Sequence, residues 1–310
     1  MLVKMDKFKI VNEIGNNLEY HSRSWNHETI NKYILKHPKG FHLEASLIKH
    51  FKDNNLRDIT IELSNMYGCP IRCKYCASNQ INNYKKLKPG DYLEQINIIL
   101  KDQKLNIDEY ENFYVSFAGI GEPSLIPEEI AEGALLINNQ INHVRFNIAT
   151  FGLNNNSFKI WGEKNLPIRR VQIPFIHYHT NKLKFIVKNI NDDYNILNVI
   201  EQAKYLVKSQ IHCQLKINFL LIEDFNDSIV DIDRTINYLK KFRDDIIIKI
   251  SILNETISSR YYNLQSPEID TMKNICKRFI ENKFHSYIFG PKKNNNFGCG
   301  QLISQYEQDV

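Results

Sequence analysis

The chain has 310 residues, of which 43% are hydrophobic and 24% charged, an ordinary composition for a globular protein. This length can bury a large core, either as one α/β-barrel-type domain or as two smaller domains. The net charge of +5 is compatible with an anionic partner. Lysine and arginine are scattered among acidic residues, however, which argues against a protein dedicated to binding nucleic acid.

The N-terminus lacks an apolar segment long enough for a secretory signal, and no apolar run approaches the length of a membrane span. We therefore expect a cytoplasmic protein without membrane contact. Six cysteines in such a chain favour metal or redox chemistry over a disulfide framework. They are Cys69, Cys73, Cys76, Cys213, Cys276 and Cys299.

Residues 1–57 form a predicted N-terminal extension that contains β-structure. Residues 8–14 and 19–25 predict a hairpin whose turn is Gly15-Asn16-Asn17. A short helix is expected at 27–36, ended by Pro38-Lys39-Gly40, and residues 42–51 fit neither type clearly.

From residue 58 onward, short β-branched runs alternate with helix-like segments. Strands are predicted at 59–63, 112–118, 143–149, 170–176, 214–222, 246–253 and 285–290, and helices near 90–102, 127–138, 195–208, 229–242 and 267–282. This alternation predicts parallel βαβ units. The expected fold is α/β, a partial (β/α)6-type barrel over residues 58–291, followed by a loop and tail at 292–310.

In such folds the chemistry lies in the loops at the carboxyl ends of the strands. A cysteine-rich loop, Cys69-Pro-Ile-Arg-Cys73-Lys-Tyr-Cys76, follows the first predicted strand. The segment Gly119-Ile-Gly-Glu-Pro123 follows the second. Two motifs at one rim predict an active site at the mouth of the barrel.

The spacing of Cys69, Cys73 and Cys76 suits a cluster more than a single ion. Three thiolates on a cubane [4Fe–4S] cluster leave one iron open to another donor. A structural zinc knuckle, as in a nucleic-acid-binding protein, is the alternative, but it needs a fourth ligand that is missing nearby. The carboxylate of Glu122 stands beside small residues at a strand end, where it can accept hydrogen bonds from an ammonium group. The competing interpretation of this tripeptide is a turn with a solvated glutamate.

The cysteine loop resembles the hallmark of the radical S-adenosylmethionine (SAM) superfamily. The resemblance implies that Cys69, Cys73 and Cys76 hold the cluster and that its open iron binds the amino and carboxylate groups of SAM. Electron transfer then cleaves SAM to methionine and a 5′-deoxyadenosyl radical. In the superfamily, the segment that matches Gly121-Glu122 holds the SAM amino group.

Further segments resemble the RlmN/Cfr group, which methylates an adenine of ribosomal RNA. They are FAGIGEPSL (117–125), IVKNINDDY (186–194), INFLLIEDFNDS (217–228) and CGQL (299–302), so that the likeness runs from about residue 58 to 303. In that group the cysteine matching Cys299 is methylated by one SAM, and a second SAM supplies the radical that removes hydrogen from the S-methyl group. A thiolate is a good nucleophile for a sulfonium methyl group. Sulfur then stabilises the carbon radical that adds to an sp² carbon.

Three departures from the group qualify this resemblance. The group carries a second catalytic cysteine where this chain has Glu62, which can act as a base but cannot exchange disulfides. Either Cys213 or Cys276 replaces that thiol, or the adduct breaks down by another route. The group also carries a longer helical RNA-binding accessory domain, and its serines near 149–152 and 175–177 are absent. Thr150 is expected to replace one hydroxyl contact to SAM, and Asn254 to hold the SAM carboxylate or ribose.

The sequence therefore predicts a radical SAM C-methyltransferase in which Cys299 and Glu62 are catalytic. Cofactor-binding residues are Gly121, Glu122, Thr150 and Asn254. The acceptor is an sp² carbon of a heteroaromatic small metabolite or peptide, or an RNA adenine. A flavodoxin- or ferredoxin-type protein is the expected electron donor. The alternative enzyme is a radical SAM isomerase, dehydrogenase or ring-forming catalyst. His177 and His179 invite a metal site, but a polar or solvated role is favoured.

Overall fold

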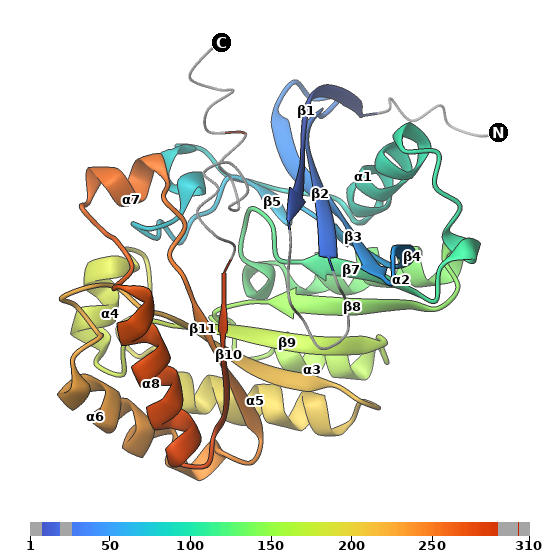
Figure 1. Cartoon of the computed structure of the whole chain (residues 1–310). Helices are drawn as coiled ribbons and strands as arrows, with labels where there is room; N and C mark the ends of the chain where they lie inside the picture. The colour runs from blue at the N-terminus through green and yellow to red at the C-terminus, as the bar shows by residue number, and fades with distance from the viewer. Residues whose placement is uncertain (1–7, 19–26, 291–302, 304–310) are drawn as a thin grey trace.

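A ten-stranded sheet runs through the protein, whose computed structural model describes residues 8–18, 27–290 and 303 (Figure 1). Its strand order is β1-β2-β3-β4-β7-β8-β9-β10-β11-β12. The strands are β1 (Lys9–Leu18), β2 (His27–Lys36), β3 (His42–Lys52), β4 (Asn55–Glu62), β7 (Asn112–Phe117), β8 (Val144–Ala149), β9 (Ile168–Phe175), β10 (Gln214–Leu220), β11 (Ile246–Ser251) and β12 (His285–Phe289). A separate ribbon pairs β5 (Met66–Tyr67) with β6 (Lys85–Lys86).

Strands β4 and β7 to β12 of the main sheet are parallel, and helices connect them. The α-helices are α1 (Pro89–Asp102), α2 (Pro127–Gln140), α3 (Ser157–Glu163), α4 (Thr180–Ile186), α5 (Ile196–Lys208), α6 (Ile229–Leu239), α7 (Ile257–Tyr261) and α8 (Ile269–Glu281), and short 3₁₀ turns lie at η1 (Ala77–Gln80), η2 (Ile107–Glu109), η3 (Pro123–Leu125) and η4 (Lys240–Phe242). The predicted partial barrel is confirmed. The short helices α3, α4 and α7 were not predicted, because five to seven residues give too little periodicity.

Alternate side chains of the parallel strands point to opposite faces of the sheet. On the outer face, residues such as Ile61, Val115, Ile148, Ile217 and Ile248 are buried in one hydrophobic core with the helices. The other positions of the same strands are largely polar, including Glu62, Ser116, Asn147, Gln172 and Lys249. The sheet therefore presents an apolar face to its helices and a polar face to the interior of the partial barrel.

The N-terminal extension differs from its prediction. Residues 27–36 form strand β2 rather than a helix, and Gly15–Asn17 lie inside strand β1 rather than in a turn. Antiparallel pairing of β2 with both β1 and β3 satisfies its backbone groups, and this tertiary pairing outweighs the weak helical pattern. Residues 19–25 of the expected hairpin lie outside the described residues.

Strands β1 to β3 continue the barrel sheet, because β3 pairs antiparallel with β4 from Ser46–Glu62 to Lys52–Asn55. The extension therefore adds its own side chains to the polar inner face. Lys32 and Glu44 form a buried ion pair there, with a distance of 2.6 Å between Nζ and Oε1. Within the described ranges, no helix is long and apolar enough to span a bilayer.

Candidate active site

The cysteine loop leaves the carboxyl end of β4 through a backbone turn that needs glycine. Gly68 has φ +64°, and a Cβ there would lie 2.1 Å from the carbonyl oxygen of Asn83. Within the loop, Arg72 also has positive φ, and its guanidinium donates to the carbonyls of Asn79 (2.7 Å) and Asn82 (2.9 Å). These hydrogen bonds fold the loop back on itself.

Residues 186–189 hold the cysteine loop from outside. The backbone N of Lys74 donates to Ile186 (2.9 Å), and the backbone N of Asn189 donates to Ile71 (3.0 Å). The Asn189 side chain donates to the carbonyl of Pro70 at 2.7 Å. The IVKNINDDY segment (186–194) therefore holds the backbone of the cysteine loop in place through these hydrogen bonds.

The Gly119–Pro123 segment follows β7 and packs directly against the chain after β4. A Cβ at Gly119 would lie 2.4 Å from the Leu63 oxygen, and one at Gly121 would lie 2.8 Å from Met66. Only glycine permits this approach. It brings Glu122 and the cysteine loop to the same rim, as the sequence predicted.

The Glu122 carboxylate is buried and heavily hydrogen-bonded rather than solvated. Its Oε1 accepts from the backbone N (3.0 Å) and hydroxyl (2.7 Å) of Ser124, and from the hydroxyl of Thr150 in a short contact. Its Oε2 accepts from the backbone N of Phe151 at 3.0 Å. Burial raises the pKa of Glu122, and these hydrogen bonds oppose the rise.

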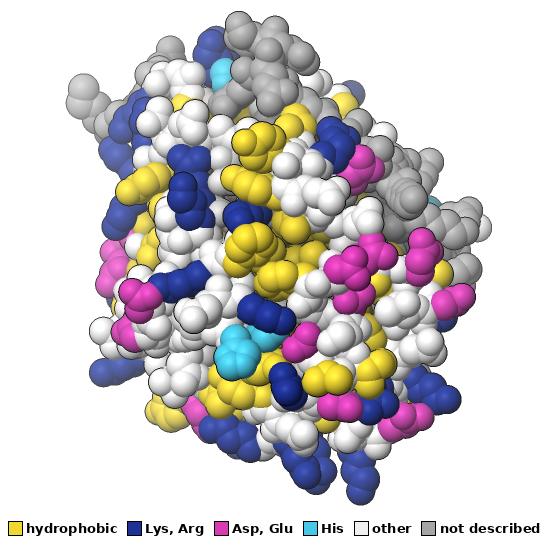
Figure 2. Space-filling model, turned by 90° about the vertical axis from the view of Figure 1, so that its left-hand side faces the viewer, with side chains coloured by type: hydrophobic (Ala, Val, Ile, Leu, Met, Phe, Trp, Pro, Cys, Tyr) yellow, Lys and Arg dark blue, Asp and Glu magenta, His cyan; other side chains and the backbone are white. Residues whose placement is uncertain are grey.

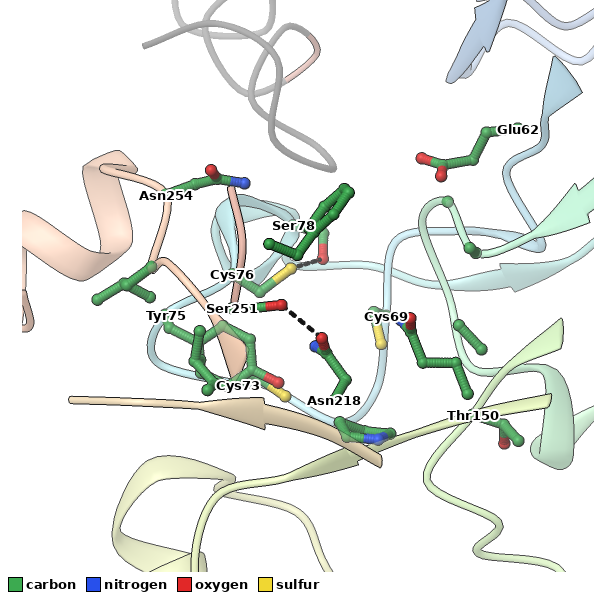
Figure 3. Close-up of a pocket in the computed structure, with 18 of the residues that line it drawn as sticks. Glu62, Cys69, Cys73, Tyr75, Cys76, Ser78, Thr150, Asn218, Ser251 and Asn254 are labelled. Atoms are coloured by element: carbon green, nitrogen blue, oxygen red, sulfur yellow. Dashed lines mark hydrogen bonds between the residues drawn. The ribbon is translucent and has the colours of Figure 1, made fainter. Parts of the chain in front are cut away.

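The residues predicted for the site meet in one pocket of about 420 Å³ inside the barrel mouth (Figure 3). Glu62 enters it from β4, Cys69, Cys73 and Cys76 from the loop, Gly121 and Glu122 from the second motif, and Thr150 and Asn254 from the ends of β8 and β11. Cys299 lies outside the described residues. Placement in one pocket agrees with the predicted site, while the roles of these residues stay predictions.

The three thiols are poorly suited to remain as free thiolates. Burial raises the pKa of Cys69 to about 12, and burial together with Cys76 and Cys69 raises the pKa of Cys73. Burial also raises the pKa of Cys76, and hydrogen bonds with Ser78 oppose that rise. A cationic centre would offset both effects, which fits a metal cluster. Among the described residues, no three such side chains are gathered tightly enough for a single metal ion. The ligands of a four-iron cluster lie farther apart, because each holds a different iron.

Glu62 points into the pocket from β4 (Figure 3). Burial raises its pKa; Lys32 and Lys249 oppose the rise, while Glu44 adds to it. A carboxyl group with a raised pKa is a suitable general base for a proton on carbon. Its placement therefore leaves the predicted base role open to test.

Cys213 and Cys276 do not line the pocket. Cys213 precedes β10, at the opposite end of the strand from the site. Cys276 lies in α8 within the outer hydrophobic core, 3.5 Å from the Ser286 hydroxyl. Neither position favours the idea that one of them replaces the second catalytic cysteine.

Several pocket residues were not singled out from the sequence. The Ser251 hydroxyl donates to the Asn218 side chain at 2.6 Å across β10 and β11 (Figure 3), and the Lys249 ammonium donates to Gln172 at 3.2 Å. Lys32 lines the same cavity from β2. Ser251, Asn218, Lys249 and Gln172 could have been found from the sequence, because they are polar residues at every second position of otherwise apolar strands.

His177 is buried behind the barrel rim, whereas His179 is exposed, and within the described chain they form no metal site. The backbone N of His179 donates to His177 Nδ1 (2.9 Å), and His177 Nε2 lies 3.7 Å from Asp231. Burial, followed by Lys182, lowers the pKa of His177 to about 4, and Asp231 opposes the shift. His177 is therefore neutral in the folded protein near pH 7.

Protonation of His177 is expected to destabilise the fold in mild acid. The unfolded chain takes up this proton near pH 6.5 and the folded chain only near 4, so the stability falls as the pH drops through this window, by up to about 3 kcal/mol. The check is chemical denaturation at pH 7.0 and 4.5 for the wild type and His177→Gln. A smaller loss is expected in the variant, and equal losses would contradict the assignment.

No family model matches this chain, but characterised protein families contain relatives that resemble it in sequence and in fold. A probable dual-specificity RNA methyltransferase RlmN of Fervidobacterium nodosum is 25% identical over 258 residues, covering 80% of this chain and 70% of the relative. Its counterpart in Dictyoglomus turgidum is 27% identical, covering 67% of this chain and 58% of the relative. A radical SAM methyltransferase from Sphaerobacter thermophilus has the same fold, with a TM-score of 0.73 at 15% identity over 95% of this chain and 80% of that one.

This chain resembles the RlmN methyltransferases in sequence and shares the fold of a radical SAM methyltransferase. It carries the three cysteines, the GEP segment and the partial barrel in one arrangement. This likeness agrees with the expected cofactors, a [4Fe–4S] cluster and SAM.

Proposed function

We propose that this protein is a radical SAM C-methyltransferase that passes a methyl-derived carbon through Cys299 to an sp² carbon of a heteroaromatic substrate. Support comes from the convergence of the three cysteines and Glu122 on one pocket, together with the likeness to methyltransferases. The match spans 58% of the Dictyoglomus relative, so the activity is proposed from the site rather than transferred from the name.

Cys69, Cys73 and Cys76 would hold the [4Fe–4S] cluster. When bound, the cluster supplies the electron that cleaves SAM. Glu122 Oε2 has one backbone donor, Phe151, and retains a lone pair that can accept from the SAM ammonium group. Thr150 and Asn254 would contact the remaining polar groups of SAM from the ends of β8 and β11.

Two described residues flank the segment that contains Cys299. Gly290, which follows β12, lines the cavity. Ile303 is buried against Ile81 and Ile120, and its backbone N donates to Glu44 Oε2 at 3.1 Å. Cys299 is four residues from Ile303, within about 14 Å of it even in a fully extended chain. This reach supports the proposed role of Cys299 as the carrier.

In the proposed reaction the Cys299 thiolate attacks the methyl group of SAM. A new S–C bond forms, the sulfonium C–S bond breaks and S-adenosylhomocysteine leaves. After hydrogen abstraction, the carbon radical on Cys299 would add to the acceptor, and Glu62 would take the proton lost from the acceptor carbon. The S–C bond to Cys299 would then break, and the transferred carbon would take up a proton to become the methyl group of the product. The thiyl radical left on Cys299 would be reduced to the thiolate by one electron from the flavodoxin- or ferredoxin-type donor. The acceptor is a small heteroaromatic molecule or peptide, or an RNA adenine; the relatives are named RNA methyltransferases.

A flavodoxin- or ferredoxin-type donor would approach over the outside of the cysteine loop. Lys74 lies in this loop, with its ammonium 3.7 Å from the centroid of the Phe185 ring, and Phe185 is 59% exposed. Figure 2 shows hydrophobic side chains with lysine and arginine beside and among them, and aspartate and glutamate along one flank, on the side of the molecule that carries α4 and α7. Cations around an exposed apolar patch suit an acidic protein partner.

Mass spectrometry of the Cys299 peptide tests the proposal most directly. After expression with cluster assembly, we expect a methyl group on Cys299 that is transferred to product upon turnover with isotopically labelled SAM. Cys213 is the internal control, and it should stay unmodified. If SAM is cleaved while Cys299 is never methylated, the proposal fails, and a radical reaction without methyl transfer takes its place.

A further inference from the structure

A group of basic side chains on the inner face of β9 to β11 has no role in the proposed reaction. Arg169, Arg170, Lys216 and Lys249 stand on these three neighbouring strands. Pairing places Lys216 opposite Gln172 and Lys249 opposite Asn218, so that Arg170, Lys216 and Lys249 form a diagonal row across the sheet. Diagonal neighbours of this kind lie about 7–8 Å apart at the backbone, within reach of long side chains.

A bulge in the pairing of β8 with β9 adds the second arginine. The register passes from Phe146–Ile168 directly to Asn147–Arg170, so that Arg169 is an extra residue. Consecutive residues normally point to opposite faces, but a bulge turns both toward one face. Arg169 accordingly stacks over the Tyr114 ring at 4.2 Å and lies 3.5 Å from the side-chain oxygen of Asn147.

Two of these cations have a carboxylate that favours their charged form, Asp58 for Arg169 and Glu62 for Lys249, but no carboxylate is among the main influences on Arg170 or Lys216. The strongest electrostatic influences on Arg170 are Arg169 and the phenols of Tyr287 and Tyr114, and those on Lys216 are other cations. The Nε atom of Arg170 is buried without a hydrogen-bond partner in the described part of the chain. The Lys216 ammonium donates to the Tyr287 hydroxyl at 2.9 Å. Buried cations and an unsatisfied donor are costly unless an anion joins them.

The group adjoins the proposed active site. Lys249 and Gln172 line the pocket and are hydrogen-bonded to each other. Arg170 precedes Gln172 by two residues on β9, and Lys216 precedes the pocket residue Asn218 by two residues on β10, so both lie closer to the bottom of the barrel. From Leu220, at the pocket, to Lys216 the strand rises about 13 Å. A small molecule with a ring at the cysteine end can therefore place an anionic group among these cations.

We propose that Arg169, Arg170, Lys216 and Lys249 form an anion site for the phosphate monoester group of a small heteroaromatic substrate. A single carboxylate is matched by one guanidinium fork, whereas two guanidinium groups, two ammonium groups and the Tyr287 hydroxyl suit a dianion with three terminal oxygens. A terminal monoester also fits an interior site better than a diester within a long RNA. The assignment of the phosphate to the methyl acceptor rests on the proposed function. The existence of the anion site does not depend on that function.

Proton uptake is expected when the anion binds. Burial, followed by Arg170, lowers the pKa values of Lys216 and Lys249 to about 7. Arg169 and Tyr287 also face Lys216, while Glu62 faces Lys249 and favours its charged form. A bound dianion would raise both pKa values again. Affinity should therefore fall as the pH rises from 7.0 to 8.5, where a phosphate monoester stays dianionic.

Calorimetric titration of the full-length holoprotein with adenosine 5′-monophosphate, adenosine and inorganic phosphate tests the site. We expect the monophosphate to bind at least about tenfold more tightly than adenosine, and Arg170→Gln to weaken it by about 10–100-fold. Arg243→Gln, which removes the same charge at the exposed end of η4, should leave affinity unchanged. Binding of phosphate alone as tightly as the monophosphate would identify a free-phosphate site and overturn the substrate role.

A thermal measurement guards against a variant that merely misfolds. Because other cations surround Arg170, Arg170→Gln should be at least as stable as the wild type when no anion is present. Phosphate should stabilise the wild type more than it stabilises the variant. Three results would contradict the proposal. Phosphate could stabilise the wild type and Arg170→Gln equally, or the protein could bind adenosine as tightly as its monophosphate. The third is that an RNA oligonucleotide binds more tightly than the monophosphate. Loss of methyl transfer with intact monophosphate binding would instead count against the proposed function.

Discussion

Replacing Cys69, Cys73 or Cys76 by alanine is expected to remove the iron–sulfur cluster and to lower SAM cleavage by about a thousandfold or more. Among the described residues that line the pocket, Cys69, Cys73 and Cys76 are the only cysteines and there is no histidine, so no described side chain of these types can take over a lost position. Residues that act as one unit lose nearly all function when any one is removed. The measurements are iron and sulfide content, visible absorbance and formation of 5′-deoxyadenosine.

Cys276→Ala is the matched control for these variants. Like Cys73, Cys276 is 8% exposed, but it lies in the outer core of α8 away from the pocket. Each substitution removes one buried sulfur atom and should cost about 1 kcal/mol of stability. Full iron content in Cys73→Ala, or loss of iron in Cys276→Ala, would show that the cluster is held elsewhere. Zinc in place of iron in the wild type would favour a zinc knuckle.

The strands that the sequence predicted well are those with an apolar face against helices. In β10, Leu215, Ile217 and Phe219 are buried in the outer core, and their spacing alone indicates a strand. Strand β2 was missed because its stability comes from pairing on both edges, which no local pattern records. Its Lys32 is a case in point: the sequence offers no sign that this lysine is buried beside Glu44.

The candidate site was predictable where a motif constrains the backbone, and less so where the fold brings single residues together. Gly121 and the cysteine loop carry their geometry in their own residue types. The basic group on β9 to β11 depends on one bulge beside Arg169, whose position follows from pairing with β8. A one-residue register shift decides which face a side chain occupies, and sequence alone rarely reveals it.

Glu122→Gln is expected to weaken both the fold and SAM binding. The carboxylate accepts hydrogen bonds from Ser124, Thr150 and the Phe151 backbone, joining the ends of β7 and β8. In Glu122→Gln, the side-chain NH2 group would face hydrogen-bond donors in place of one carboxylate oxygen. The loss of charged, buried hydrogen bonds should lower the free energy of unfolding by about 3 kcal/mol. Denaturant unfolding measures this cost, and equilibrium binding of SAM to the holoprotein should weaken at least about tenfold.

Two further variants separate the structural role of Glu122 from its role toward SAM. Glu128→Gln makes the same change on the exposed first turn of α2 and should alter stability by less than about 0.5 kcal/mol. Ser124→Ala removes a hydroxyl donor to Oε1, at a residue that does not line the pocket, but leaves Oε2, the atom available to the SAM ammonium, so stability should fall more than SAM affinity. Unchanged SAM affinity in a destabilised Glu122→Gln would leave the carboxylate as a brace between β7 and β8, and the SAM ammonium would then need another acceptor in the pocket.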